Sequence, residues 1–156
     1  MQLYRLARRA YVEGSGGAFS GEGAYLAGSR WNSPGHRVAF AASSESLAIL
    51  EYLVHATNEA YFEDVVLVIA ELAERFVMTI DATQLPNDWR DFPPSASTVR
   101  VGNEWLVSGR SLALSVPSAV VPREPNVLIN SAHRDMRHLR ILALEPWLPD
   151  LRLKKR

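Results

Sequence analysis

The segment from Gly21 to Glu51 constrains the fold most, because three chemically different elements follow one another within it. A glycine-rich stretch carries Arg30, a short apolar run that includes Phe40 predicts a strand, and an apolar helix carries Glu51. Glycine lets the backbone turn sharply or approach a ligand closely, and the planar, always charged guanidinium suits a phosphate or a carboxylate. The segment therefore predicts a binding site, with a phosphate-containing ligand as the obvious candidate.

The helix of this segment is expected over residues 45–59. Ser43 or Ser44 can cap its start, and its apolar run LAILEYLVHA is interrupted only by Glu51 and His55. These two residues are four apart and so share one helix face. That face is either exposed to solvent or part of a site. A metal site at this spacing lacks an evident third ligand, so no bound metal is expected.

The rest of the chain predicts more strands than helices. Alternating or β-branched apolar runs indicate strands at 2–6, 38–42, 65–70, 76–80, 112–116, 126–130 and 139–144. A second helix is expected at 98–108, with Gly109 as its C-terminal cap. Two stretches rich in glycine or proline, 13–28 and 85–97, predict loops. The predicted fold class is α+β, with one domain over residues 1–156 built around a strongly bent or split sheet.

Composition excludes several classes of protein. Of the 156 residues, 47% are hydrophobic, enough for the core of one domain. The 17 basic and 17 acidic residues give no net charge, so no overall field attracts nucleic acid or an anionic membrane. There is no cysteine, and no run approaches the roughly 18 apolar residues of a membrane-spanning helix, so a cytoplasmic location is expected. Walker A, G-x-S-x-G and H-E-x-x-H motifs are absent, which excludes kinases, serine hydrolases and zincins.

Nine short motifs follow one another along nearly the whole chain. They are Y-R at 4–5, F-x-G-x-G-A at 19–24, G-x-R-W-N-x-x-G at 28–35, F-A at 40–41, L-A-I-L-E at 47–51, L-P-x-x-W at 85–89, G-x-x-W-L at 102–106, V-P-S-A-V-V at 116–121 and N-x-L-I-N at 126–130. In this order they resemble the RES domain family, which is named for an arginine, a glutamate and a serine. Members of that family are NAD-consuming toxins of bacterial toxin–antitoxin pairs. The resemblance implies the split mixed sheet of the ADP-ribosyltransferases, with an NAD cleft between its halves and flanking helices.

The resemblance assigns the three residues of the family name to Arg30, Glu51 and Ser118, with NAD+ as a substrate and no prosthetic group. Arg30 would hold the pyrophosphate, Glu51 would stabilise the oxocarbenium-like ribose, and Ser118 would bond the nicotinamide amide or a ribose hydroxyl. Phe40 stands where the family commonly has tyrosine, so stacking on nicotinamide is kept and the phenol hydrogen bond is lost. The structural alternatives stay open: Arg30 could cap carbonyls, Glu51 could face water, and Ser118 could bond its own turn.

Some residues outside this trio also carry expectations. Strand alternation places Tyr4 and Arg5 on opposite faces, which makes Arg5 a candidate for the lining of the NAD cleft. Asn126 and Asn130 are expected to satisfy loop backbone. Three tryptophans are expected to anchor the core: Trp31, Trp89 and Trp105.

The expected reaction is cleavage of NAD+ with transfer of ADP-ribose to water or phosphate. A toxin that ADP-ribosylates a protein would use the same cleft and is the main alternative. A noncatalytic binding module or an RNA-directed toxin is more distant, and the neutral charge weighs against RNA. The resemblance also implies an Xre-type antitoxin with a helix-turn-helix region that blocks the cleft, so that DNA is contacted only through the antitoxin. Exposed apolar surface near the glycine-rich loop would favour a homodimer.

Overall fold

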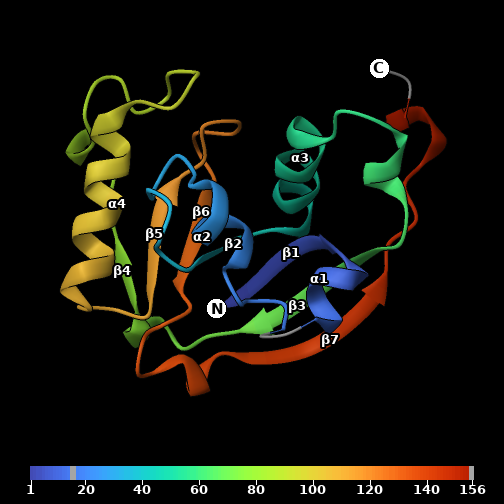
Figure 1. The fold of residues 1–156 in the computed structure, drawn as a ribbon, viewed down its shortest axis with the longest axis horizontal. Helices are drawn as coiled ribbons and strands as arrows, with labels where there is room; N and C mark the ends of the chain where they lie inside the picture. The colour runs from blue at the N-terminus through green and yellow to red at the C-terminus, as the bar shows by residue number, and fades with distance from the viewer. Residues whose placement is uncertain (15–16, 155–156) are drawn as a thin grey trace.

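The computed structural model describes residues 1–14 and 17–154, which form a seven-stranded sheet flanked by helices (Figure 1). The strands are β1 (Gln2–Arg8), β2 (Val38–Ala42), β3 (Val65–Glu71), β4 (Val77–Thr79), β5 (Ala113–Pro117), β6 (Pro125–Asn130) and β7 (Arg140–Pro146). The α-helices are α1 (Arg9–Glu13), α2 (Glu22–Ala27), α3 (Glu45–His55) and α4 (Ala96–Ser108). The predicted α+β class is confirmed, and each predicted strand has a counterpart.

The sheet is mixed and divided in its middle. Its strand order is β4-β5-β6-β2-β1-β3-β7, in which β4 and β5 are parallel and the other neighbours are antiparallel. The pairs β1–β3 and β2–β6 extend along whole strands, whereas β1 and β2 share the single register pair Tyr4↔Ala42. The two halves of the sheet diverge beside this pair. Backbone groups that a continuous ladder would satisfy therefore need other partners there.

Helix α3 lies over the divergence between β1 and β2 (Figure 1). It begins at Glu45, after the predicted cap Ser44, whose hydroxyl accepts a hydrogen bond from the N–H of Leu47. The helix ends at His55, so the prediction of residues 45–59 is four residues too long. The backbone is extended at residues 56 and 58, and a separate 3-10 turn follows at Glu59–Phe62.

The core follows the divided sheet. One hydrophobic cluster, which includes Leu3, Val68 and Ile129, spans both halves of the sheet. The residues that alternate with these along the strands belong to two separate clusters, one beneath α4 and one beneath α3. The cluster beneath α4 contains three buried tryptophans, as predicted: Trp31, Trp89 and Trp105. The gap between these two clusters coincides with the divergence of β1 and β2.

The region 13–28 is more regular than predicted. Helix α2 occupies six of its residues and buries none of them. A short helix without a buried face has no hydrophobic period by which the sequence could reveal it. Its position is held by Arg37, which forms an ion pair with Glu22 and stacks over the ring of Tyr25.

The loop that carries Arg30 is packed tightly against α4. A Cβ atom added to Gly102 of α4 would come within 1.8 Å of the carbonyl oxygen of Trp31, so only glycine permits this approach. Asn103 exchanges two hydrogen bonds with Ser33 across the same contact. Helix α4 ends at the predicted cap, Gly109, which has the left-handed conformation with φ 55°. The Arg30 loop and α4 therefore form one structural unit.

Candidate active site

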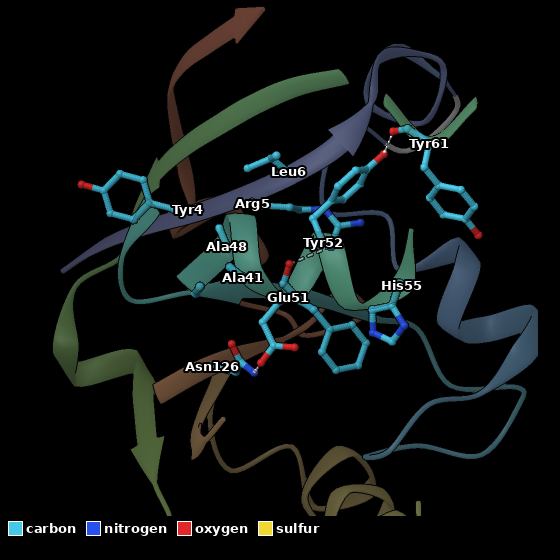
Figure 2. Close-up of a pocket in the computed structure, with 12 residues that line it drawn as sticks. Tyr4, Arg5, Leu6, Ala41, Ala48, Glu51, Tyr52, His55, Tyr61 and Asn126 are labelled. Atoms are coloured by element: carbon cyan, nitrogen blue, oxygen red, sulfur yellow. Dashed lines mark hydrogen bonds between the residues drawn. The ribbon is translucent and has the colours of Figure 1, made fainter. Parts of the chain in front are cut away.

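A cavity of about 260 Å³ opens where β1 and β2 diverge. Residues 4–6 of β1 and 40–42 of β2 form two of its sides, and α3 contributes Glu51, Tyr52 and His55 (Figure 2). The helix face that carries Glu51 and His55 thus lines a cavity, with Glu51 half-buried and His55 exposed. The cavity exists because the ladder between β1 and β2 is interrupted.

Arg5 projects from β1 into this cavity. Its Nη1 donates a hydrogen bond of 2.7 Å to the carbonyl oxygen of Phe40 on β2 (Figure 2), so the side chain bridges the two strands where their backbones separate. Its Nε is buried without a hydrogen bond, and no described carboxylate pairs with the guanidinium. Burial lowers the pKa of Arg5 to about 10, which leaves it charged at neutral pH. A buried charge with unused donors is costly, and an anionic ligand would supply the missing partner.

Glu51 faces the same cavity from α3, and one of its carboxylate oxygens is fixed by two donors. The hydroxyl of Ser118 donates to Oε1 at 2.6 Å and the Nδ2 of Asn126 donates to it at 2.5 Å. The other oxygen, Oε2, accepts no hydrogen bond from the described residues. The carboxylate is therefore held in one orientation, with Oε2 left without a donor among the described residues.

Ser118 is fully buried, and its hydroxyl is completely used. It donates to Glu51 and accepts hydrogen bonds of 3.0 Å from the N–H groups of Val120 and Val121. In this arrangement Ser118 acts on the cavity through Glu51, whereas the resemblance has it bond the substrate. The alternative in which Ser118 bonds its own turn accounts for its contacts with the backbone of Val120 and Val121. Its contact with Glu51 shows that Ser118 also positions the carboxylate.

Arg30 lies outside the lining of this cavity. Its Nη1 donates to the carbonyl oxygens of Trp89 at 2.7 Å and Asp91 at 2.9 Å, so it joins the glycine-rich loop to the loop that precedes α4. These contacts match the alternative in which Arg30 caps backbone carbonyl groups. Its Nε and Nη2 donate to no described residue. Burial lowers the pKa of Arg30, and the negative charges of Glu51 and Asp91 oppose that shift, which places Glu51 within electrostatic reach.

Phe40 and Tyr52 form the apolar part of the site. Phe40 lines the cavity from β2 and is half-buried. The hydroxyl of Tyr52 donates a hydrogen bond of 2.6 Å to the carbonyl oxygen of Tyr61. The ring of Tyr52 makes edge contacts with the rings of Tyr61 and Trp147. These contacts attach the segment after α3 to the rim of the cavity. Burial raises the pKa of Tyr52, and the charge of Arg8 opposes that shift.

Sequence reasoning missed Asn126, Tyr52 and Tyr61 as site residues. Asn126 was expected to satisfy loop backbone, but its amide binds Glu51, a residue 75 positions earlier. Its place at the start of the N-x-L-I-N motif was the available signal. Asn130, by contrast, is buried and donates to the carbonyl oxygen of Leu106, a structural role as predicted.

Among residues 1–14 and 17–154, no group of three or more His, Cys, Asp or Glu side chains is arranged to hold a metal ion. No helix of the described chain has the length and hydrophobicity needed to cross a membrane.

The fold and cavity define an α+β domain in which an arginine and a carboxylate face a common space between the halves of a divided sheet. The same fold occurs in a crystal structure of the M. tuberculosis MbcT–MbcA toxin–antitoxin complex. A chain of that complex aligns with a TM-score of 0.74 and 21% identity, covering 99% of this chain and 89% of its own length.

The family follows from sequence similarity. The RES domain model matches residues 2–153. Toxin Res of Photorhabdus laumondii is 42% identical over 135 residues, or 86% of this chain and 85% of that protein. The Prs ADP-ribosylating toxin of Sphingobium sp. is 35% identical over 137 residues, or 86% of this chain and 85% of that protein. The chain belongs to the RES domain family, and these relatives are toxins.

Proposed function

We propose that this protein is the toxin of a toxin–antitoxin pair and that it cleaves the bond between nicotinamide and ribose in NAD+. One observation carries the proposal: a single cavity presents Arg5, which has no carboxylate partner among the described residues, and Glu51, with its carboxylate held in place. NAD+ matches both groups, because it has a pyrophosphate for the guanidinium and a ribose that becomes cationic during cleavage.

Glu51 supports the bond-breaking step. The electron pair of the C1′–N bond leaves with nicotinamide, and the ribose acquires oxocarbenium character that Oε2 of Glu51 stabilises. Ser118 and Asn126 hold the carboxylate in position, so little reorganisation is needed as charge develops. Water or phosphate then forms a bond to C1′ and releases a proton, and His55, one turn after Glu51 on the same cavity wall, is placed to accept it.

The two arginines supply the anion contacts. Arg5 offers Nη2 to the pyrophosphate from within the sheet, while its Nη1 stays bound to the carbonyl oxygen of Phe40 and its Nε is buried. Arg30 offers Nε and Nη2 from the glycine-rich loop, while its Nη1 stays bound to carbonyls. Phe40 stacks on the nicotinamide ring without the hydrogen bond that a tyrosine would add.

Transfer of ADP-ribose to a protein side chain is the second candidate. The 35% identity to the Prs ADP-ribosylating toxin favours it. Both reactions share the cleavage of nicotinamide and the role of Glu51, and they differ only in which nucleophile reaches C1′. A noncatalytic binding module or an RNA-directed toxin has no such observation in its favour.

The test is to incubate the purified protein with NAD+, with and without phosphate, and to resolve the products by chromatography. We expect free nicotinamide in both cases, with ADP-ribose from water and a phosphorylated ADP-ribose when phosphate is the acceptor. Labelled NAD+ added with a bacterial lysate distinguishes protein transfer, because the label then remains on a protein. Intact NAD+ together with cleaved RNA would contradict the proposal.

The proposed partner is an Xre-type antitoxin that covers the cavity and contacts DNA through its own helix-turn-helix region. The toxin has no net charge, so DNA affinity is expected from the antitoxin alone. Expression of the toxin without its antitoxin in the bacterial cytoplasm should deplete NAD+ and arrest growth. Leu26, which is 68% exposed on α2 beside the glycine-rich loop, supplies the apolar surface that would favour a homodimer.

A further inference from the structure

A second hollow adjoins the cavity and shares Arg5 with it. It has a volume of about 350 Å³ and is lined by the end of β1, by Tyr11 of α1 and by the segment from Asn58 to Tyr61. The two hollows share Arg5, Leu6, Tyr52 and Tyr61. Arg5 therefore contributes to the lining of two adjoining compartments, one that contains Glu51 and one that does not.

The second compartment is walled by fixed groups. Arg9, at the start of α1, forms ion pairs with Glu13 and with Asp64, which joins α1 to the start of β3. On the opposite wall, the hydrogen bond from Tyr52 to the carbonyl oxygen of Tyr61 attaches the segment 58–61 to α3 (Figure 2). The space between α1 and this segment is thus held open by contacts on both sides.

The side chains that face this space suit a nucleoside. Tyr11 is 69% exposed and Tyr61 is half-buried, so both rings offer surface on which a base can stack. The Oδ1 of Asn58 accepts from the N–H of Ala60, which leaves its amide group free to donate to a ring nitrogen. Arg8 adds a positive charge without an ion-pair partner among the described residues.

We propose that this second compartment binds the purine nucleoside half of a dinucleotide substrate, with Tyr11 as the residue that stacks on the base. The inference rests on the proposed function, because the pyrophosphate at Arg5 links the two halves. The nicotinamide ribose then lies beside Glu51 and the adenosine lies between α1 and the segment 58–61. It follows that the enzyme selects the whole dinucleotide over nicotinamide mononucleotide, which would fill only the compartment with Glu51.

The experiment compares NAD+ with nicotinamide mononucleotide in the parental protein and in Tyr11→Ala. The parental kcat/KM should be at least about tenfold higher for NAD+, since stacking of one base on an aromatic ring contributes roughly this much. Tyr11→Ala should remove most of that preference by raising KM for NAD+, with kcat and the rate on the mononucleotide unchanged. Tyr11 is exposed, so the variant is expected to fold. Tyr25→Ala, which alters an exposed tyrosine on α2, is the matched control and should keep the preference.

ADP binding, measured by calorimetry, gives a readout that needs no turnover. ADP carries the pyrophosphate and adenosine but no nicotinamide ribose. We expect ADP to bind, with Kd raised about tenfold by Tyr11→Ala and unchanged by Glu51→Gln. Equal use of the two substrates, an equal loss on both in Tyr11→Ala, or no ADP binding at millimolar concentration would overturn the inference. Failure of NAD+ cleavage with Tyr11-dependent ADP binding would instead overturn the proposed function alone.

Discussion

Two arginines of this protein have opposite surroundings. Arg5 lies on a regular strand, yet its Nε is buried without a partner and its charge is not neutralised by any described carboxylate. Arg30 lies in a glycine-rich loop of the kind that often binds phosphate, yet its Nη1 is bound to the carbonyl oxygens of Trp89 and Asp91. The strand arginine keeps a buried donor without a partner, whereas the loop arginine joins two loops of the fold.

The difference shows how a functional cation can be distinguished from a structural one. Glycine allows close approach, but at Gly102 the approaching group is the backbone of Trp31 and not a ligand. A buried donor without a partner is costly in a folded protein, so it persists where a ligand completes it. A buried donor without a hydrogen-bond partner is therefore a stronger indication of ligand binding than a position in a glycine-rich loop.

The largest expected effect is on Glu51, the carboxylate that lines the same cavity as Arg5. Glu51→Gln should lower kcat for NAD+ cleavage by about 100-fold or more, because the amide keeps the shape and loses the charge that stabilises the cationic ribose. The amide oxygen can still accept from Ser118 and Asn126, so the melting temperature should stay close to that of the parent. Glu45→Gln, at the exposed start of the same helix, is the control. Parental turnover by Glu51→Gln would remove this residue from the mechanism.

The next largest effect is expected at Arg5, and it tests the difference between the two arginines. Arg5→Met should lower kcat/KM for NAD+ by about 10- to 100-fold, because a charged hydrogen bond to the pyrophosphate contributes about 1.5–3 kcal/mol. Stability should change little, since the variant removes an unpaired buried charge together with the hydrogen bond to the carbonyl oxygen of Phe40. Steady-state kinetics and a thermal melt measure the two quantities. Arg100→Met, on the exposed surface of α4, should change neither.

For Arg30 we expect a larger loss of stability and a smaller loss of activity than for Arg5. Arg30→Met leaves two carbonyl oxygens without a charged donor, so the free energy of unfolding should drop by about 1.5–3 kcal/mol. We expect kcat/KM, measured well below the melting temperature, to fall by less than for Arg5→Met. A stable Arg30→Met protein with a greater loss of NAD+ affinity than Arg5→Met would invert the comparison and make Arg30 the main pyrophosphate contact.

The smallest expected change in turnover is at Phe40, whose carbonyl oxygen accepts the hydrogen bond from Arg5. Phe40→Tyr keeps the aromatic face and adds a hydroxyl at the position where the family commonly has one. Turnover should stay the same or rise by no more than about tenfold, the value of one added hydrogen bond at its upper range. The NAD+ cleavage assay measures this turnover. Phe40→Leu, which removes the stacking ring and should lower activity, is assayed beside it. Loss of activity in Phe40→Tyr would mean that the ring is packed too closely for a hydroxyl.

Local signals in the sequence were sufficient for most of the secondary structure. The strand Val38–Ala42 and the start of α3 after Ser44 follow from apolar patterning and a capping hydroxyl. The cap at Gly109 follows from the left-handed conformation that glycine adopts readily. Helix α2 and the end of α3 at His55 were not predictable in this way, because α2 buries no residue and no glycine or proline marks the end of α3.

The sequence by itself determined which chemical groups are available: an apolar helix with Glu51 on the face it shares with His55, a serine in V-P-S-A-V-V, and several arginines. Only the tertiary structure decided which of them meet. Arg5 reaches Phe40 across the divided sheet, and Asn126 reaches Glu51 across 75 positions of the chain. Such contacts depend on where two strands stop pairing, and that point is set by the packing of the whole sheet and not by the residues adjacent in sequence.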